Sequence, residues 1–302
     1  MDLTSVSRTE LLLWLADELR YLRGSVSRRT AAERLRSSVP HIGHLETGRN
    51  PPSMMDIEGL LDLYGARDQL DRLRTIREAI KHAEDWWSEY VDLLQSPVQA
   101  WLGLESVAAR LYTFDSHVIP PLLQVGSYLE EVLRAWHGRA DDQLRRLVDL
   151  DRNRQGIQEA RTSPAELVAI IDQQVLHRRV GDADLMKQQL SHLLKASRRP
   201  NLTIHILPGN RGLQGCMDAS FAIATMPESF GHHPGGAFVP SHRHRGWLQN
   251  LSDKDAKALR QGACYRQHQE VQLYRAAWDQ LHEQALDPEQ SRNVIEQALS
   301  EW

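Results

Sequence analysis

The sequence has little of several features that would assign it to a familiar class of protein. It contains two cysteines, Cys216 and Cys264, among 302 residues. That is too few for a disulfide framework, so a reducing cytoplasm is the simpler expectation. The longest early apolar run, LLLWLA at 11–16, is far shorter than the ~20 residues that span a membrane. Asp2 and Glu10 stand where a secretory signal would carry basic residues. We therefore expect a cytoplasmic protein without a membrane partner.

A broad basic field is also absent, because the net charge of the chain is −4. The first 52 residues carry eight Arg against six acidic residues, which gives +2, so the remaining 250 residues sum to −6. The N-terminal end is therefore the part better suited to DNA. The motifs HExxH and CxxC do not occur, and we expect no cofactor. The length suggests two domains.

The N-terminal residues have the outline of a helix-turn-helix. Residues 8–23 predict an amphipathic helix, and Ser27 can cap the next helix, RRTAAERLR. A turn and a second short helix, SVPHIGHL, follow, and Gly48 suits its end. Ser53 and Asp56 resemble a capping box that opens another helix. A DNA reader of this kind needs one helix to fit the groove and another to brace it on the backbone.

The rest of the chain mixes helices and strands. The apolar stripe over 68–95 predicts one long connector helix, and the compact or alternating apolar runs predict strands. We expect strands at 166–172, 201–208 and 220–226, and helices within 119–136 and at 183–197, 253–286 and 288–301. The predicted fold class is α+β, mostly α, with an N-terminal helix-turn-helix bundle and a C-terminal small sheet packed by helices. The predicted domains are 1–66, the connector 67–96, and 97–302.

Candidate DNA contacts lie on and around the short second helix. Arg28 and Arg29 open the bracing helix, where side chains and backbone N–H groups can meet phosphate. Arg49 follows the reading helix and is a further phosphate candidate. The candidates for base contacts are Ser38, His41 and His44, because Arg, Gln and Asn, the usual bidentate readers, are absent from this helix. On helical stripes alone, a four-helix module for dimerisation or packing is an equal alternative.

Several motifs carry a resemblance to known regulators. The segments AERL, HLETGRNPP and DIEGLLDLYGARDQ, all within 32–69, resemble the helix-turn-helix of the xenobiotic-response-element (XRE) family of bacterial repressors. The segments at 85–94, 101–135 and 175–208 resemble the actinobacterial Scr1-like, or antitoxin-like, transcriptional regulators. The resemblance covers roughly residues 10 to 226 and resumes near 271–299.

The resemblance implies a DNA-binding transcriptional regulator that acts as a homodimer on double-stranded DNA. The C-terminal domain would sense a small-molecule ligand or a small partner protein encoded nearby. Polar residues of that domain that could line a cavity are Glu105, Tyr112, Gln124 and Tyr128. The reading surface departs from the family: Arg28 replaces Gln, Pro40 and His41 replace Ser or Thr, and His44 replaces Arg. Gly43 costs the helix about 1 kcal/mol relative to Ala.

The segment GHHPGGAFVPSHRHRGW, residues 231–247, departs furthest from the family. It places four histidines, His232, His233, His242 and His244, within thirteen residues. In an extended chain His242 and His244 face the same side, which suits a metal or a general base. If the chain is an enzyme, these four histidines are its candidate catalytic residues, together with Cys216 and Asp172. The alternative for this segment is a plain polar loop. Two alternatives concern the whole protein: an enzyme or ligand-binding protein of specialised metabolism with a degenerate helix-turn-helix, and an antitoxin that binds only its partner.

Overall fold

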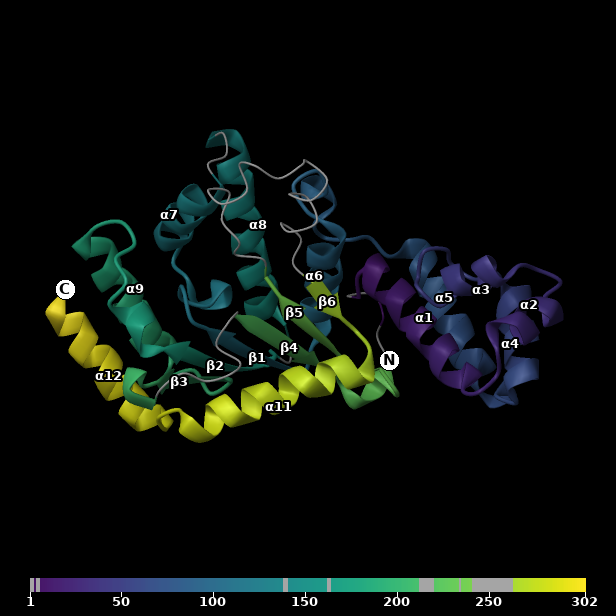
Figure 1. Ribbon diagram of the computed structural model, residues 1–302. Coiled ribbons are helices and arrows are strands. Elements are labelled where there is room, and N and C mark those ends of the chain that lie inside the picture. Colours follow the sequence, from purple (N-terminus) through teal and green to yellow (C-terminus); the bar gives the residue numbers. More distant parts are fainter. Residues whose placement is uncertain are drawn as a thin grey trace, which may run out of the picture. The chain divides into compact units, whose positions relative to one another are not determined.

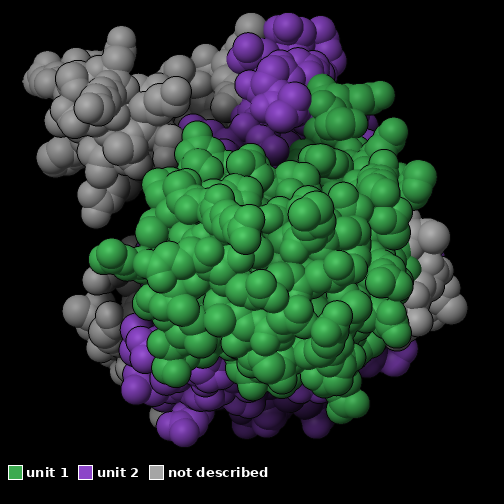
Figure 2. Space-filling model, turned by 90° about the vertical axis from the view of Figure 1, so that its right-hand side faces the viewer, with its two compact units in different colours: residues 1–89, 226–233 green, residues 90–225, 234–302 purple. Residues whose placement is uncertain are grey.

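The computed structural model divides the chain into two compact units, whose elements are labelled in Figure 1. The structure describes residues 3, 6–137, 141–161, 164–211, 220–233, 235–240 and 263–302. Met1–Glu89 and Met226–His233 form the first unit, and Tyr90–Thr225 and Pro234–Trp302 form the second. Figure 2 shows the two units in different colours. A short segment from the second half of the chain therefore belongs to the N-terminal unit.

The N-terminal unit is built from helices whose ends are set by side-chain caps. Ser7, Ser27 and Ser38 each accept a hydrogen bond from a backbone N–H of the first turn. Ser53 and Asp56 form the predicted capping box, and Gly65 ends that helix in the left-handed conformation. The helices are α1 (Arg8–Arg23), α2 (Arg28–Arg34), α3 (Val39–Leu45), α4 (Met54–Tyr64), η1 (Arg67–Gln69) and α5 (Leu70–His82). The predicted helix-turn-helix bundle is thus confirmed.

The core of this unit consists of the predicted apolar stripes. Leu11, Leu15 and Leu19 of α1 are fully buried, and so are Ile42 and Leu45 of α3. Val39, the first residue of α3, remains 44% exposed. The two buried side chains of α3 hold it against the bundle and leave its other face open.

The predicted helix over 68–95 ends earlier than expected. α5 stops at His82, Ala83 is extended, and only the short turn η2 (Ser88–Tyr90) follows. The Asp85 carboxylate accepts hydrogen bonds from the backbone N–H of Thr9 at 2.8 Å and from its hydroxyl at 2.6 Å. Asp85 thereby satisfies a free donor in the first turn of α1, and this interaction competes with continuing the helix.

The second unit contains a six-stranded mixed sheet. Its strand order is β3-β2-β1-β4-β5-β6, with β1, β2 and β3 mutually parallel and the remaining pairs antiparallel. The strands are β1 (Arg110–Asp115), β2 (Glu166–Asp172), β3 (Leu202–Leu207), β4 (Phe221–Thr225), β5 (Gly236–Val239) and β6 (Ala263–Tyr265). The three predicted strands correspond to β2, β3 and β4, and the sequence did not predict the other three.

Helices cover both faces of the sheet (Figure 1). On one face, Val168 and Ile170 of β2 pack in a cluster with residues of α11. On the other face, Ala169 and Ile171 pack in a cluster with residues of α7, α9 and α12. This burial on both sides explains the continuous apolar run of β2. The helices are α6 (Ser96–Val107), α7 (Gly126–His137), α8 (Asp141–Ala160), α9 (Ala183–Ala196), α11 (His268–Gln284) and α12 (Pro288–Glu301), with 3-10 turns η3 (Pro121–Leu123), η4 (Gln173–Leu176) and η5 (Gly209–Arg211).

The helix predicted over 253–286 begins later than expected. Residues 263–265 form β6, which pairs with β5, and α11 starts at His268. Residues 253–262 lie outside the described part of the chain. Within the described residues, no helix is both long enough and apolar enough to span a bilayer.

Candidate nucleic-acid interface and the polar cluster of the second unit

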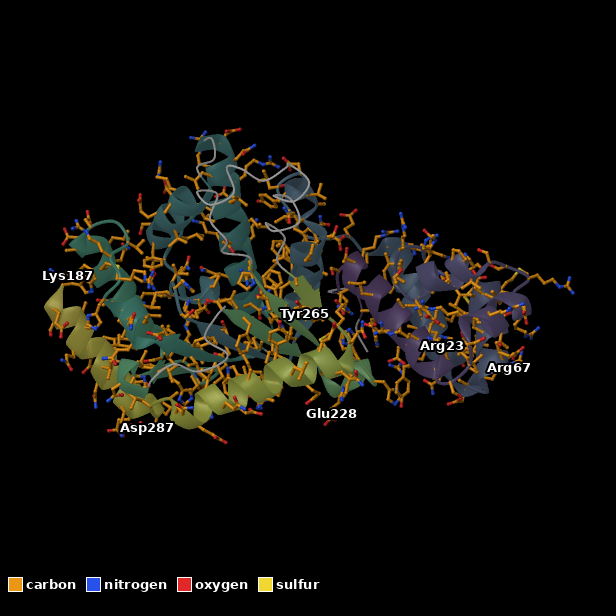
Figure 3. The ribbon with its side chains drawn as sticks, viewed as in Figure 1. Arg23, Arg67, Lys187, Glu228, Tyr265 and Asp287 are labelled. Atoms are coloured by element: carbon orange, nitrogen blue, oxygen red, sulfur yellow. The ribbon has the colours of Figure 1, made fainter. Side chains whose placement is uncertain are left out.

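A buried carboxylate, Glu46, fixes the geometry of the helix-turn-helix. Its two oxygens accept hydrogen bonds from Arg23 Nε at 2.5 Å and Arg28 Nε at 2.7 Å, and its side chain is 2% exposed. Arg23, labelled in Figure 3, also donates to the Val26 carbonyl. Burial, and then the charge of Glu46, raise the pKa of Tyr64 to about 12, against an opposing effect of Arg23. The end of α1, the start of α2 and the end of α3 are thus tied to one carboxylate.

The predicted base-contact residues lie on α3 or at its start. Ser38 is exposed, and its hydroxyl accepts a hydrogen bond from the His41 N–H at 3.3 Å, so it acts as the helix cap. His41 is half-buried, with Nε2 3.7 Å from Asp56 Oδ1. His44 is also partly exposed, in the last turn. A Cβ added at Gly43 would meet nothing within 4 Å. The glycine therefore loosens the helix without being required by its surroundings.

The predicted phosphate contacts keep exposed guanidinium groups. The Arg28 side chain is 46% exposed although it pairs with Glu46, and that of Arg29 is 83% exposed beside Glu33. Arg49 is exposed just after α3. Arg36, between α2 and α3, is exposed at a φ of +50°. These guanidinium groups border the α2–turn–α3 segment, where phosphates flank a groove-bound helix.

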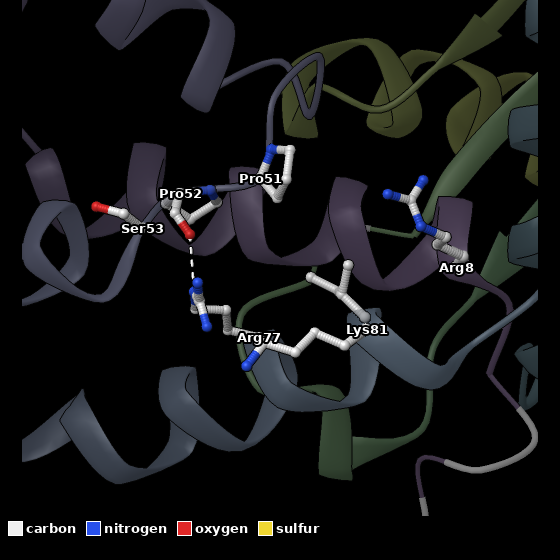
Figure 4. Close-up of a pocket in the computed structure, with 7 residues that line it drawn as sticks. Arg8, Pro51, Pro52, Ser53, Arg77 and Lys81 are labelled. Atoms are coloured by element: carbon white, nitrogen blue, oxygen red, sulfur yellow. Dashed lines mark hydrogen bonds between the residues drawn. The ribbon is translucent and has the colours of Figure 1, made fainter.

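A second cationic feature of the N-terminal unit is a hollow of about 300 Å³ beside the loop that follows α3 (Figure 4). Arg77 donates from Nε to the Pro52 carbonyl at 2.9 Å, and Arg77 and Lys81 share the Glu78 carboxylate. Three cationic side chains line the hollow, and Glu78 pairs with two of them, so the hollow has a positive charge balance. It is lined by Arg8, Pro51, Pro52, Ser53, Arg77, Ile80 and Lys81.

In the second unit, one of the predicted ligand residues, Glu105, belongs to a buried ion pair. Arg154 of α8 donates two hydrogen bonds to Glu105 of α6 and a third to Asp151 at 3.2 Å. Trp101 Nε1 also donates to Glu105, at 3.0 Å. Burial works to lower the pKa of Arg154, but Glu105 and Asp151 together raise it above its ordinary value. This pair joins α6 to α8.

Asp115, at the carboxyl end of β1, is a buried acid whose hydrogen bonds come from hydroxyl groups. It is 4% exposed and accepts a hydrogen bond from the Thr113 hydroxyl at 2.6 Å. Burial raises its pKa to about 6, against the opposing effects of Thr113, Ser220 and the charge of Arg154. The carboxyl ends of parallel strands are where open sheets commonly bind ligands.

Gln124 and Tyr128, two further predicted ligand residues, lie near this strand end. Gln124 Nε2 donates to the Ile119 carbonyl at 2.5 Å, while its buried Oε1 has no hydrogen-bond partner among the described residues. Tyr128 is fully buried, and burial raises its pKa to about 12, with a further raising effect of the Asp115 charge. The structure thus brings Gln124, Tyr128 and Asp115 together, and it leaves one buried acceptor open.

The remaining predicted residues of this unit lie elsewhere. Tyr112 is on the opposite face of β1, 4.8 Å from the Trp278 ring and beneath the Arg275 guanidinium. Asp172 caps η4, accepting from the Gln174 N–H at 2.8 Å. Neither belongs to the group of Gln124, Tyr128 and Asp115.

The histidine-rich segment is described only in part. His232 stacks on Tyr21 with ring centroids 4.0 Å apart, and His233 is buried against Glu10. Cys216, His242 and His244 lie outside the described residues. In the described part of the chain, no group of three or more His, Cys, Asp or Glu is arranged to hold a metal ion.

Two family models match the chain. Residues 14–79 match a helix-turn-helix domain, and residues 98–297 match a domain of unknown function, DUF5753. Comparison with curated proteins and with solved structures gives no significant match. The helix-turn-helix match agrees with the bundle of α1 to α5 and indicates the class of DNA-binding regulators.

The second match covers 200 of the chain's 302 residues. The protein therefore belongs to the family defined by the DUF5753 domain and carries a helix-turn-helix domain at its N-terminal end.

The residues that sequence reasoning missed are Arg23, Arg154 and Asp115. The sequence did not indicate the partners of the two arginines, because Glu46 lies 23 positions from Arg23 and Glu105 lies 49 positions from Arg154. Asp115 is the last residue of a strand that was itself not predicted. A sequence signal existed only for Glu46, the partner of Arg23, which lies within the segment HLETGRNPP that carries the family resemblance.

Proposed function

We propose that the protein is a transcriptional regulator of the XRE type, related to the Scr1-like regulators, that binds double-stranded DNA as a homodimer. α3 enters the major groove, and Arg28, Arg29 and Arg49 contact phosphates on either side of it. Ser38, His41 and His44 provide the polar contacts to base edges. α3 has fewer side chains than usual that can make two hydrogen bonds to one base. The shape of the DNA therefore contributes a larger share of the binding specificity.

The observation that carries this proposal is the Glu46 clamp. Arg23 and Arg28 converge on one buried carboxylate, and Ile42 and Leu45 remain fully buried beside it. Pro40 occupies the first turn of α3, where no internal N–H bond is lost. The unusual residues of α3 therefore leave the frame of the helix-turn-helix intact.

The phosphate contacts are tested by arginine substitution in the full chain. Arg28→Ala and Arg49→Ala should each weaken binding to the DNA around the protein's own gene by roughly 10-fold on all sequences. Each should also reduce the slope of log K against log salt by about 1. Arg134→Ala, which removes a half-exposed arginine of the second unit, is the control. The complex should contain two protomers per site. Affinity that neither variant changes would count against the assigned interface.

We further propose that the second unit senses a small-molecule ligand rather than a partner protein. The support is the buried acceptor Oε1 of Gln124, which lies in the same strand-end region as Asp115 and Tyr128. A buried acceptor without a partner is costly, and a ligand N–H or O–H would satisfy it.

Native mass spectrometry of the full protein, purified gently from its host cells, tests the sensor. The expected result is a co-purifying small molecule that is lost in Gln124→Leu, a variant of similar volume without the acceptor. Gln158→Leu, which removes a polar side chain of α8 that donates to the Glu105 carbonyl, controls for loosened packing. An unliganded mass for the wild-type protein would contradict the proposal.

A further inference from the structure

The segment Met226–His233 connects β4 to β5 in the sequence but belongs to the N-terminal unit. It contains the short turn η6 (Glu228–Phe230). Between Thr225, the end of β4, and Gly236, the start of β5, the chain therefore leaves one compact unit, contributes to the other and returns. Nothing in the fold of the sheet requires such a detour.

The middle of the segment is held by an aromatic contact and two hydrogen bonds. The Phe230 ring lies 4.4 Å from the Trp14 ring, centroid to centroid, and Phe230 is 4% exposed. Its carbonyl accepts hydrogen bonds from Trp14 Nε1 at 3.1 Å and from Arg72 Nη2 at 3.2 Å. Side chains of α1 and α5 therefore both donate hydrogen bonds to the same carbonyl group.

The end of the segment forms a buried imidazole–carboxyl contact. His233 Nε2 lies 2.9 Å from Glu10 Oε1, and neither side chain has any exposed surface. A carboxylate taken out of water needs donors, so removing one partner of such a pair destabilises the fold strongly. His233 is thus a structural partner of α1 although it lies more than 200 positions away in the sequence.

The backbone approaches closely between these two anchors. Gly231 has a φ of +63°, and a Cβ added there would lie 2.4 Å from Arg72 Nη2. Arg72 in turn pairs with Glu18, with Nη2 2.7 Å from Oε1. Only glycine permits both this conformation and this approach.

The receiving face of α1 is distinct from its core stripe. Leu11, Leu15 and Leu19 face the helical bundle, whereas the residues that contact the segment, Glu10, Trp14, Glu18 and Tyr21, recur at spacings of four, four and three. Such spacing places them on one side of the helix. Polar side chains with 0% and 1% exposure, such as Glu10 and Glu18, are rare on a helix unless something covers them.

We propose that Met226–His233, which we call the strap, completes the fold of the DNA-reading unit, and that the DUF5753 domain controls DNA binding through it. The strap of the same chain is what covers this face of α1 and contacts Arg72 of α5. A ligand-driven change in β4 or β5 would be transmitted to α1 through the strap's covalent ends. The control of DNA binding rests on the proposed function, whereas the docking of the strap does not.

Hydrogen exchange in the full chain tests the docking. Glu10→Gln, His233→Gln and the double variant form a cycle. Each single variant should raise the exchange rates of the α1 amides by roughly 10-fold or more, because it disturbs a polar contact whose two side chains are fully buried. The double variant should be no worse than the single ones, and exchange in β2 and β3 should not change. Additive effects, or unchanged α1 exchange, would overturn the docking.

His232→Gln is the matched comparison: the neighbouring His232 side chain is 52% exposed and stacks on Tyr21, so this variant should raise α1 exchange far less than His233→Gln does. Phe230→Leu gives a milder second perturbation should His233→Gln fail to fold, and it should also raise α1 exchange. In a mixture of the Glu10→Gln and His233→Gln proteins, the exchange rates of the α1 amides should remain as high as in each variant alone. Wild-type exchange in the mixture would mean that the strap docks on a second copy, which overturns the intramolecular assignment.

The same variants test separately whether the strap docks on α1 and whether it controls DNA binding. If the strap controls reading, the variants with faster α1 exchange should lose at least 10-fold in affinity for the promoter fragment. Faster exchange with unchanged DNA affinity would overturn the control while leaving the docking supported. A wild-type protein that binds no DNA would refute the proposed function, and the exchange data alone would then decide whether the strap docks.

Discussion

At the scale of single residues, polar side chains in the interior are placed by partners that are distant in the sequence. Glu46 and Glu105 each collect two donor side chains. The sequence analysis named Glu105, Tyr112, Gln124 and Tyr128 together as candidate ligand residues, which stays a prediction, and it could not show that Tyr112 lies on the other face of β1. Alternation along a strand is visible in a sequence only after the strand has been recognised.

The raised pKa of Asp115 predicts a pH-dependent stability. Burial raises this pKa to about 6 in the folded protein, from an ordinary value of 3.8. The folded state therefore binds the proton more tightly. The resulting stabilisation is fully present below about pH 4 and is lost as the pH rises through about 6. Two pKa units correspond to about 3 kcal/mol.

Asp115→Asn removes this titration while keeping the shape of the side chain. The free energy of unfolding of the wild type, relative to that of the variant, should fall by about 3 kcal/mol between pH 4 and pH 7. Urea titrations at both pH values measure the difference. If the free energies of unfolding of the two proteins differed equally at both pH values, the raised pKa of Asp115 would be contradicted.

At the scale of elements, helices with caps and apolar stripes were predictable and short strands were not. Ser27 and the Ser53–Asp56 box begin the helices where the sequence placed them. β1 was missed because Arg110, Thr113 and Asp115 interrupt its apolar residues, although all except Arg110 are buried. β5 and β6 have four and three residues, too few to show a period. α5 ended early because Asp85 bonds to α1, a contact that no local pattern records.

Gly43 allows a direct test of how firmly α3 is formed. It lies within α3, and a Cβ there would meet nothing within 4 Å. Gly43→Ala should therefore raise the free energy of unfolding by about 1 kcal/mol. Gly65→Ala is the matched control: it also has open space but sits at a φ of +68°, so it should lower stability by about 1 kcal/mol. Thermal unfolding monitored by circular dichroism measures both, and a destabilising Gly43→Ala would show that α3 is not an ordinary helix.

At the scale of the whole molecule, the sequence predicted the parts better than their connections. The predicted helix-turn-helix agrees with the matched helix-turn-helix domain, and the predicted mixed C-terminal fold agrees with the six-stranded sheet and its helices, while the division at residues 66 and 96 stays a prediction. The strap could not be foreseen, because a loop between two strands carries no sign that it packs on a helix more than 200 residues earlier. The histidines that drew attention as candidate catalytic groups include two, His232 and His233, that the structure uses to hold α1.

The measurement that tests the central claim most directly is the binding of the purified full chain to the DNA around its own gene. The assay is a titration across a range of salt concentrations with excess unrelated DNA present. The account predicts a complex that resists the competitor and an affinity that falls steeply and linearly on a log–log plot as phosphate counterions are released. A folded protein whose weak binding is equally strong on unrelated DNA would contradict the claim that α3 reads sequence.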